Sequence, residues 1–251
     1  MERFQFNENE FPYGTLQQFG LTQEMIEDLP TRVLNDLYDG RRSPLLPIQV
    51  EDENQEVVCS RARFSLVRKD SGDVDVLFYP ELQEADLSLF DEQQRAKLEA
   101  GKSIIAIIEN KEGKRVPSFV QIDPETKQVL SAPTQVIGRN LQVATDAVNL
   151  SAAELNSLQK GDVVMFTRED GQPISMGIDL NERSGIRFTP GDEQMWSEQR
   201  MRDWDKYTFG VYGCWVMGDD GNLSYVNEDD YTDEMWNEQK KAGLRAFTHQ
   251  R

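Results

Sequence analysis

The sequence predicts an α+β protein made of three repeated modules, each with one helix and a small antiparallel β-meander. Three observations lead to this fold. A helical segment that ends in glycine occurs three times, each copy continues into short stretches of strand-like alternation, and each copy closes with a proline. Such a repeat indicates duplicated modules that bury one another's faces. The modules occupy residues 31–80, 91–133 and 151–190.

Residues 1–30 precede the first module and are predicted to form a helical cap. Thr22 is a suitable N-cap for a short helix that ends before Pro30. Apolar residues recur at helical spacing in this segment, and we expect them to cover the first module. They are Leu16, Phe19, Leu21, Met25, Ile26 and Leu29.

The helix of each module carries a signal at its end. Gly40, Gly101 and Gly161 follow the three helices and predict left-handed C-terminal caps, because glycine adopts a positive φ without a Cβ clash. Further signals repeat around them. A leucine lies three residues before each glycine (Leu37, Leu98 and Leu158), and capping-box pairs begin two helices (Asp91 with Gln94, and Ser151 with Glu154).

The strand segments alternate with period two. Ile174, Met176 and Ile178 alternate with Ser175 and Gly177, which predicts one buried and one solvated face, as in an antiparallel meander. Each closing proline ends the last strand, because proline cannot donate to a ladder.

The remaining segments are less regular. Residues 134–150 are interpreted as a linker between the second and third modules, with a turn at 138–140. Residues 191–251 form a C-terminal segment that is aromatic and acidic and contains all four tryptophans. We interpret it as a divergent partial repeat, with a hairpin over 207–227. A final helix is predicted to close at Gly243, with no strands after it to cover Met235, Trp236, Leu244 and Phe247.

Composition excludes several classes of function. The chain has 251 residues, a formal net charge of −18, two cysteines and one histidine, His249. The charge disfavours direct nucleic-acid binding, since a phosphate backbone would be repelled. A single histidine near the end argues against a Ser-His or Cys-His nucleophile and a Cys/His zinc site. No apolar stretch predicts a membrane helix or a signal peptide, so we expect a cytoplasmic protein with reduced thiols.

The C-terminal segment contains the candidate binding residues. Tryptophan and tyrosine concentrate binding energy at interfaces, although they also build local cores. The acidic run at 227–234 favours a partner with a basic surface; it lacks the order of an EF-hand calcium loop, so no metal ligand is assigned. We assign no catalytic or cofactor-binding residue. The candidate partner-binding residues are Trp196, Trp204, Tyr231, Trp236, Asp229, Asp230 and Asp233.

An arginine pair forms a weaker anion-binding candidate. Arg41 and Arg42 follow the first module helix, where a guanidinium can grip an anion. Solvent exposure, or pairing with the acidic surplus, is the favoured interpretation.

Short motifs in the first two thirds of the chain resemble two bacterial families. The Glu10–Phe11–Pro12 start, the Phe19–Gly20–Leu21 step and the Leu-x-x-Gly-Arg-Arg-x-Pro-Leu stretch from residue 37 resemble the domain-of-unknown-function family 4099. The two later modules resemble family 3945 in the Leu-x-x-Gly before a strand. The resemblance implies an accessory role on bacterial mobile elements such as conjugative transposons, and it implies no catalytic residue.

These observations favour a non-enzymatic interaction protein that binds a protein partner. Two alternatives stay open. An acidic inhibitor that imitates DNA would need carboxylates in two rows at phosphate-like spacing, and a carboxylate-based metal-dependent enzyme would need Asp and Glu from different modules in one cleft. The oligomeric state is also open.

Overall fold

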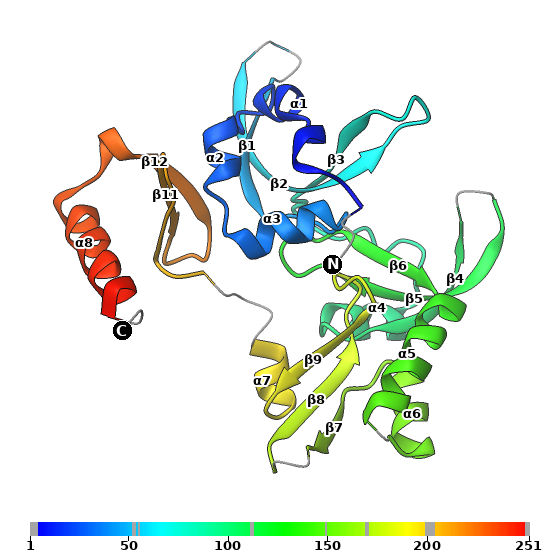
Figure 1. Cartoon of the computed structure of the whole chain (residues 1–251). Helices are drawn as coiled ribbons and strands as arrows, with labels where there is room; N and C mark the ends of the chain where they lie inside the picture. Colours follow the sequence, from blue (N-terminus) through cyan, green and yellow to red (C-terminus); the bar gives the residue numbers. More distant parts are fainter. Residues whose placement is uncertain are drawn as a thin grey trace. The chain divides into compact units, whose positions relative to one another are not determined.

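A computed structural model describes residues 5–51, 54, 56–110, 113–148, 150–168, 171–198 and 204–248. The structure is α+β, as predicted (Figure 1). Within the described residues, the strands form four three-stranded antiparallel sheets, each a meander in chain order. The chain divides into two compact units, Met1–Glu81 with Asp203–Arg251, and Leu82–Arg202. The second unit is thus an insertion between the two parts of the first.

The first unit contains the cap, the first module and the C-terminal segment. A single cluster of buried apolar side chains joins all three. Thr22 caps α2 as expected, its hydroxyl accepting from Met25 N at 3.3 Å. The elements are η1 (Glu8–Glu10), α1 (Tyr13–Gln17), α2 (Gln23–Glu27), α3 (Thr31–Tyr38), β1 (Leu46–Glu51), β2 (Val57–Arg68), β3 (Val74–Pro80), β10 (Tyr207–Phe209), β11 (Gly213–Met217), β12 (Leu223–Asn227), η3 (Glu228–Asp230) and α8 (Asp233–Thr248).

The second unit contains the other two modules. Its sheets are β4–β5–β6 and β7–β8–β9, and two clusters of buried apolar side chains lie on them. The elements are α4 (Glu92–Glu99), β4 (Ile104–Glu109), β5 (Arg115–Ile122), β6 (Val129–Pro133), α5 (Thr134–Val148), α6 (Ala152–Gln159), β7 (Val164–Thr167), β8 (Pro173–Ile178), β9 (Ile186–Pro190) and α7 (Glu193–Glu198).

The three helix ends repeat in atomic detail. Gly40, Gly101 and Gly161 have φ of 76°, 75° and 88°. Each glycine N–H donates to the carbonyl of the leucine three residues earlier at 2.9 Å, and the next N–H reaches back to the residue before that leucine, which is a Schellman motif. The three leucine side chains are buried against their sheets. One leucine therefore both closes the helix and fixes it to the strands.

The strand registers also repeat. Three residues after the glycine, Ile104 pairs with Val120 in the second module, and Val164 pairs with Met176 in the third. The closing proline Pro133 lies opposite Ser118, two residues before Val120. Pro190 lies opposite Ile174, two residues before Met176. Equal strand number, order and register agree with the prediction that these two modules repeat one unit.

Three interpretations of secondary structure were wrong. Residues 134–148 form helix α5, so the turn expected at 138–140 is absent, because Ile137 and Leu141, one turn apart, are buried on one face. The segment 207–227 forms three strands, so it is a fourth sheet rather than a hairpin. Helix α8 continues through Gly243, whose φ is not positive.

The middle strands β5 and β8 of the second unit are buried on both faces over most of their length, in contrast to the expected solvated face. Every residue of β8 after Pro173 is buried. The polar side chains on the second face are hydrogen-bonded instead of solvated: Ser175 donates to Gly191 O at 2.8 Å, and Gln121 of β5 donates to Ile178 O at 3.3 Å and accepts from Leu180 N at 3.0 Å. Gln121 thereby links the two modules of this unit.

The burial of Leu158 predicts a large effect of its truncation. Leu158→Ala should lower the free energy of unfolding by about 2–5 kcal/mol, because it leaves a cavity between α6 and its sheet. Urea denaturation measures this. Val143→Ala, at a residue 72% exposed on α5, is the control and should change stability by less than about 0.5 kcal/mol. A similar small loss for Leu158→Ala would contradict the packing described.

Candidate functional site

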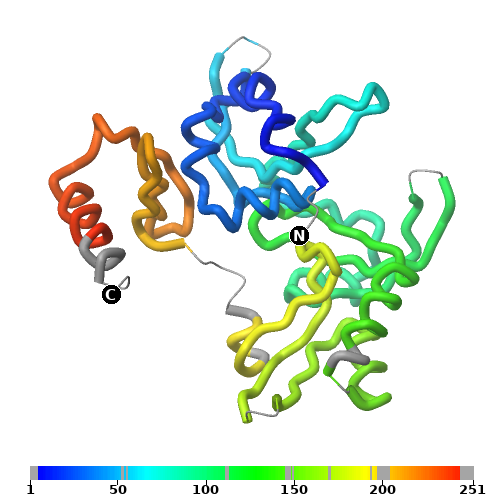
Figure 2. The backbone as a smooth tube through the Cα atoms, viewed as in Figure 1, coloured from blue at the N-terminus to red at the C-terminus, as the bar shows by residue number. Residues whose placement is uncertain are grey.

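One face of the C-terminal sheet packs on the N-terminal cap (Figure 2). Trp215, in the middle of β11, is fully buried, and its Nε1 donates to Met25 O at 3.0 Å. Trp204 lies half-buried against it, with the two rings edge-on at a centroid distance of 6.4 Å. Trp215 therefore belongs to the core of the first unit, and Trp204 packs against that core while part of its surface stays exposed.

The carboxylate of Asp28 anchors this sheet to the cap. Asp28 is 4% exposed and accepts hydrogen bonds from Val211 N, from Tyr212 N at 3.0 Å and from the Tyr225 hydroxyl at 2.6 Å. Burial, followed by the hydrogen bond to Asp28, raises the pKa of Tyr225 well above its usual range, so this phenol remains a donor. A Cβ at position 210 would overlap the Asp28 carboxylate, so the backbone can come this close to Asp28 only because residue 210 is glycine.

The opposite face of the sheet carries a row of four aromatic rings. Successive centroids lie 6.0 Å apart from Tyr207 to Phe209, 5.7 Å from Phe209 to Tyr231 and 5.1 Å from Tyr231 to Trp236. Tyr207 and Phe209 belong to β10, and Trp236 belongs to α8, which lies beside this sheet (Figure 1). We call these four residues the aromatic row.

The aromatic row is partly buried and ends in an exposed ring. Burial raises the pKa of Tyr231 to about 12, with smaller contributions from Cys214 and Glu228. Met235 is buried and α8 contacts β10, so strands that precede this helix in the chain cover part of its apolar side. The side chains of Leu244 and Phe247 lie outside those described. Trp236 is 37% exposed, the most exposed of the four tryptophans.

Carboxylates border the exposed end of the row. Asp229 and Asp230 lie in η3 and Asp233 begins α8, and all three are exposed. Glu234 is paired with Lys206 at 2.9 Å, and this hydrogen bond lowers the pKa of Glu234. The acidic run has no basic residue in its own sequence. Lys206, which directly precedes β10, neutralises one of its carboxylates, that of Glu234.

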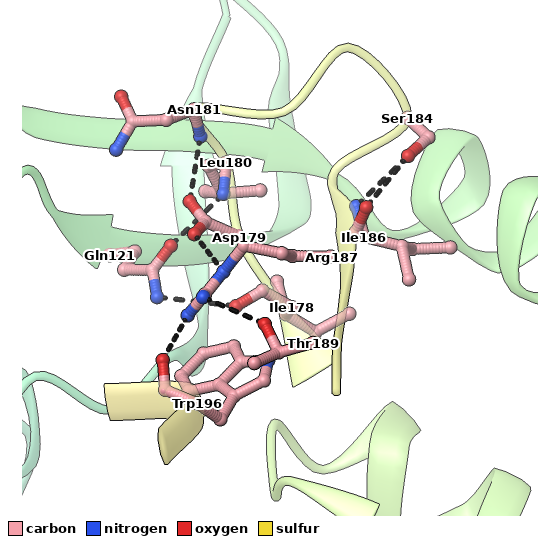
Figure 3. Close-up of polar contacts among 10 residues, drawn as sticks. All are labelled: Gln121, Ile178, Asp179, Leu180, Asn181, Ser184, Ile186, Arg187, Thr189 and Trp196. Carbon is pink, nitrogen blue, oxygen red and sulfur yellow. Dashed lines mark hydrogen bonds and ion pairs between the residues drawn. The ribbon is translucent and has the colours of Figure 1, made fainter. Parts of the chain in front are cut away.

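Trp196 lies in the other unit and is buried (Figure 3). The guanidinium of Arg187 is stacked 3.9 Å above its ring and donates to Trp196 O at 2.7 Å. Arg187 is held in turn by Asp179 at 2.9 Å and by the Thr189 hydroxyl at 3.0 Å. This network fixes α7 on the second face of β8. The Trp196 ring is inaccessible to a partner, so Trp196 does not belong to the candidate surface.

The sequence analysis missed the Arg187 network, although a signal was present. Asp123 and Asp179 both follow the last residue of a middle strand, and both are buried. Each accepts from the backbone N–H two residues later, Asp123 from Glu125 and Asp179 from Asn181, both at 3.1 Å. An aspartate at the same place in two modules could have indicated a structural role for its carboxylate.

The arginine pair is occupied within the first unit. Arg41 pairs with Asp36 at 2.9 Å, and Arg42 lies over the Tyr79 ring with its Cζ 4.0 Å from the centroid. The pairing of Arg41 with the acidic surplus agrees with the favoured interpretation.

The part of the chain that the structure describes contains neither a cluster of metal ligands nor a helix able to cross a membrane. In that part of the chain, no three His, Cys, Asp or Glu side chains are grouped so that they could hold a metal ion. None of the helices described combines the length and the apolar character that crossing a bilayer would require. The thiols of Cys59 and Cys214 are both free, and burial raises the pKa of Cys214 to about 11.

Comparison with protein families gave a match for the N-terminal part. Residues 6–89 match the family model of a protein of unknown function (DUF4099). This match confirms the resemblance seen in the Glu10–Pro12, Phe19–Leu21 and Gly40–Arg42 motifs, and it spans the cap and the first module. Comparisons with curated proteins and with solved structures found no match.

The Asp28 anchor predicts a specific loss of stability. Asp28→Ala should lower the free energy of unfolding of the first unit by roughly 1–3 kcal/mol or more, because two backbone N–H groups and the Tyr225 hydroxyl lose their acceptor. Chemical denaturation followed by tryptophan fluorescence reports it through Trp215. Asp229→Ala, which removes an exposed carboxylate, serves as the control; equal stabilities for the two variants would contradict an anchoring role.

Proposed function

We propose that this chain is a non-enzymatic interaction protein that binds a protein partner through the exposed end of its aromatic row. The supporting observation is that Trp236 remains exposed while it contacts Tyr231 in a partly buried row bordered by Asp229, Asp230 and Asp233. A ring that is already held in place loses little conformational freedom on binding, which favours its use as an anchor.

The charge around the row supports a partner with a basic surface. The chain carries −18 overall, and Asp229, Asp230 and Asp233 lie at the exposed end of the row. Acidic side chains around an aromatic anchor attract a basic surface over a long range and repel acidic ones. The partner class we propose is therefore a protein with lysine or arginine near an apolar contact.

The cellular setting is a finer part of the same proposal. The later modules resemble family 3945, and the N-terminal part matches DUF4099. On this basis we propose a cytoplasmic accessory role for a bacterial mobile element.

Substitution of the anchor tests the proposal. Trp236→Ala should weaken binding to the partner by more than about 1 kcal/mol, while the free energy of unfolding changes less because the ring is not part of the buried core. Immobilised wild-type and variant proteins would first capture the partner from an extract of the source cells, and titration would then measure its Kd. Tyr212→Ala, at another exposed aromatic residue of the same unit, is the matched control. Unchanged binding by Trp236→Ala would refute the proposed surface.

Neutralising the carboxylates should affect the rate of association. The triple variant Asp229→Asn, Asp230→Asn, Asp233→Asn should slow association and flatten its salt dependence, with a smaller effect on dissociation. Asp70→Asn with Glu99→Gln and Asp162→Asn removes the same charge from exposed positions elsewhere. Stopped-flow kinetics with the captured partner compares the association rates of the two triple variants. Equal association rates would show that only net charge matters.

Deletion of residues 191–251 is not a usable test. That deletion would remove Trp215 and Leu223 from the core of the first unit and would leave Asp28 buried without its donors. Point substitutions at Trp236 and at the exposed carboxylates avoid this loss of structure.

A further inference from the structure

The edge strand β4 of the second unit is unprotected against pairing with another strand. Its residues 104–108 are five consecutive apolar residues with neither charge nor proline. Within the described residues, β4 is hydrogen-bonded to β5 on one side and no backbone hydrogen bond joins its other side to another segment. Proteins usually protect such an edge with charge, proline or short length.

The other edge strands mostly carry such protection. Proline interrupts or ends several of them, a charged side chain lies within others, and two are only three or four residues long. The protecting features are Pro47 in β1, Asp75 in β3, Pro133 in β6, Arg187 in β9, and the short strands β7 (Val164–Thr167) and β10 (Tyr207–Phe209). The contrast makes β4 the edge most suited to pairing.

The two faces of β4 differ in exposure. Ile104 is buried in the cluster that includes Leu98 and Val120. On the other face, Ile105 and Ile107 are 44% and 54% exposed. A strand added along this edge would extend the buried face and would cover the two exposed isoleucines.

We propose that β4 pairs antiparallel with β4 of a second copy of this chain, about a two-fold axis at Ala106. In this register Ile105 of each copy lies opposite Ile107 of the other, and Ile104 lies opposite Ile108. Both faces then match apolar to apolar across the new pair, because directly opposed residues share a face. The two three-stranded sheets become one continuous six-stranded sheet.

Charge at the ends of β4 selects the antiparallel copy as the occupant. Lys102 precedes the strand and Glu109 ends it, and both are exposed. In the antiparallel register Lys102 lies opposite Asn110 and Glu109 lies opposite Ser103, so each end of the pair carries one residue of each charge, whereas an in-register parallel pair would place like charges directly opposite one another. The charges at the two ends of the strand therefore favour the antiparallel orientation.

The dimer should respond to salt in the opposite direction from the proposed partner binding. Each copy carries −18, so repulsion between copies weakens at higher ionic strength and dimerisation strengthens. Binding of a basic partner by the acidic row weakens under the same change. The two surfaces lie in different units, so failure of one proposal leaves the other testable.

Sedimentation equilibrium of the full chain over a concentration series tests the pairing. Wild-type protein should show a reversible monomer–dimer equilibrium. Ile107→Lys should raise the dimer Kd by roughly tenfold or more, because the ammonium would lie opposite Ile105 of the other copy. Val143→Lys, on an exposed residue of α5 in the same unit, should leave the Kd unchanged. A monomer at all concentrations, or a dimer insensitive to Ile107→Lys, would overturn the proposal.

A disulfide trap tests the register without disturbing the charge. In a Cys59→Ser background, Ala106→Cys places one thiol on the two-fold axis, opposite its own copy, and mild oxidation should yield a covalent dimer. Ser131→Cys, on the opposite edge of the same sheet, is the control and should remain monomeric. Equal trapping of both variants would indicate random collision and would overturn the assigned register.

Charge exchange tests the orientation. Lys102→Glu alone and Glu109→Lys alone should each dimerise poorly, because like charges then meet at both ends of the pair. An equimolar mixture should form a heterodimer, since one strand carries only acidic ends and the other only basic ends. Failure of the mixture to associate, with both variants folded by circular dichroism, would overturn the antiparallel arrangement.

Discussion

The structure of the first unit depends on one buried carboxylate. A polar side chain removed from water is costly unless hydrogen bonds replace its hydration, and Asp28 receives them from Val211 N, Tyr212 N and the Tyr225 hydroxyl. These donors come from the far end of the chain, so Asp28 can be satisfied only when the C-terminal sheet has returned to the N-terminal cap. The first unit therefore needs both ends of its sequence, with the second unit inserted between them in the chain.

This closure determines which aromatic side chains can meet a partner. Because the sheet β10–β12 turns Trp215 and Tyr225 toward the cap, period-two alternation turns Tyr207 and Phe209 to the other face. Helix α8 covers part of that face through Met235 and leaves Trp236 at its border. The composition of the segment left open whether its aromatic rings form a core or an interface, and the sheet divides them between a core face and a half-covered face.

Local signals allowed the module ends to be predicted from the sequence. The Leu-x-x-Gly pattern and the capping boxes act within a few residues, so Gly101, Gly161, Ser151 and Asp91 behave in the structure as their neighbours dictate. The match to DUF4099 likewise rests on motifs within one continuous stretch. Features that depend on interactions between residues close in sequence could be predicted without knowledge of the rest of the fold.

Long-range contacts account for the features that could not be predicted. Gly138 suggested a turn and Gly243 a helix end, yet both lie inside helices; in α5 the packing of Ile137 and Leu141 outweighs the low helical propensity of glycine. Ser175 resembles a solvated strand residue, yet α7 covers that face. The role of Asp28 needed knowledge of which distant backbone amides would meet it.

The two modules of the second unit show how copies of one unit acquire different surroundings. Asp123 and Asp179 occupy the same place after the middle strand, and each binds the backbone of its own turn. Asp123 also accepts from the Thr126 hydroxyl at 2.9 Å, whereas Asp179 holds Arg187, and Arg187 carries the Trp196 ring on its guanidinium. A carboxylate that closes a turn in one copy thus attaches a helix to the sheet in the other. That attachment covers the second face of β8, and it explains why Trp196 is part of the fold and not of a binding surface.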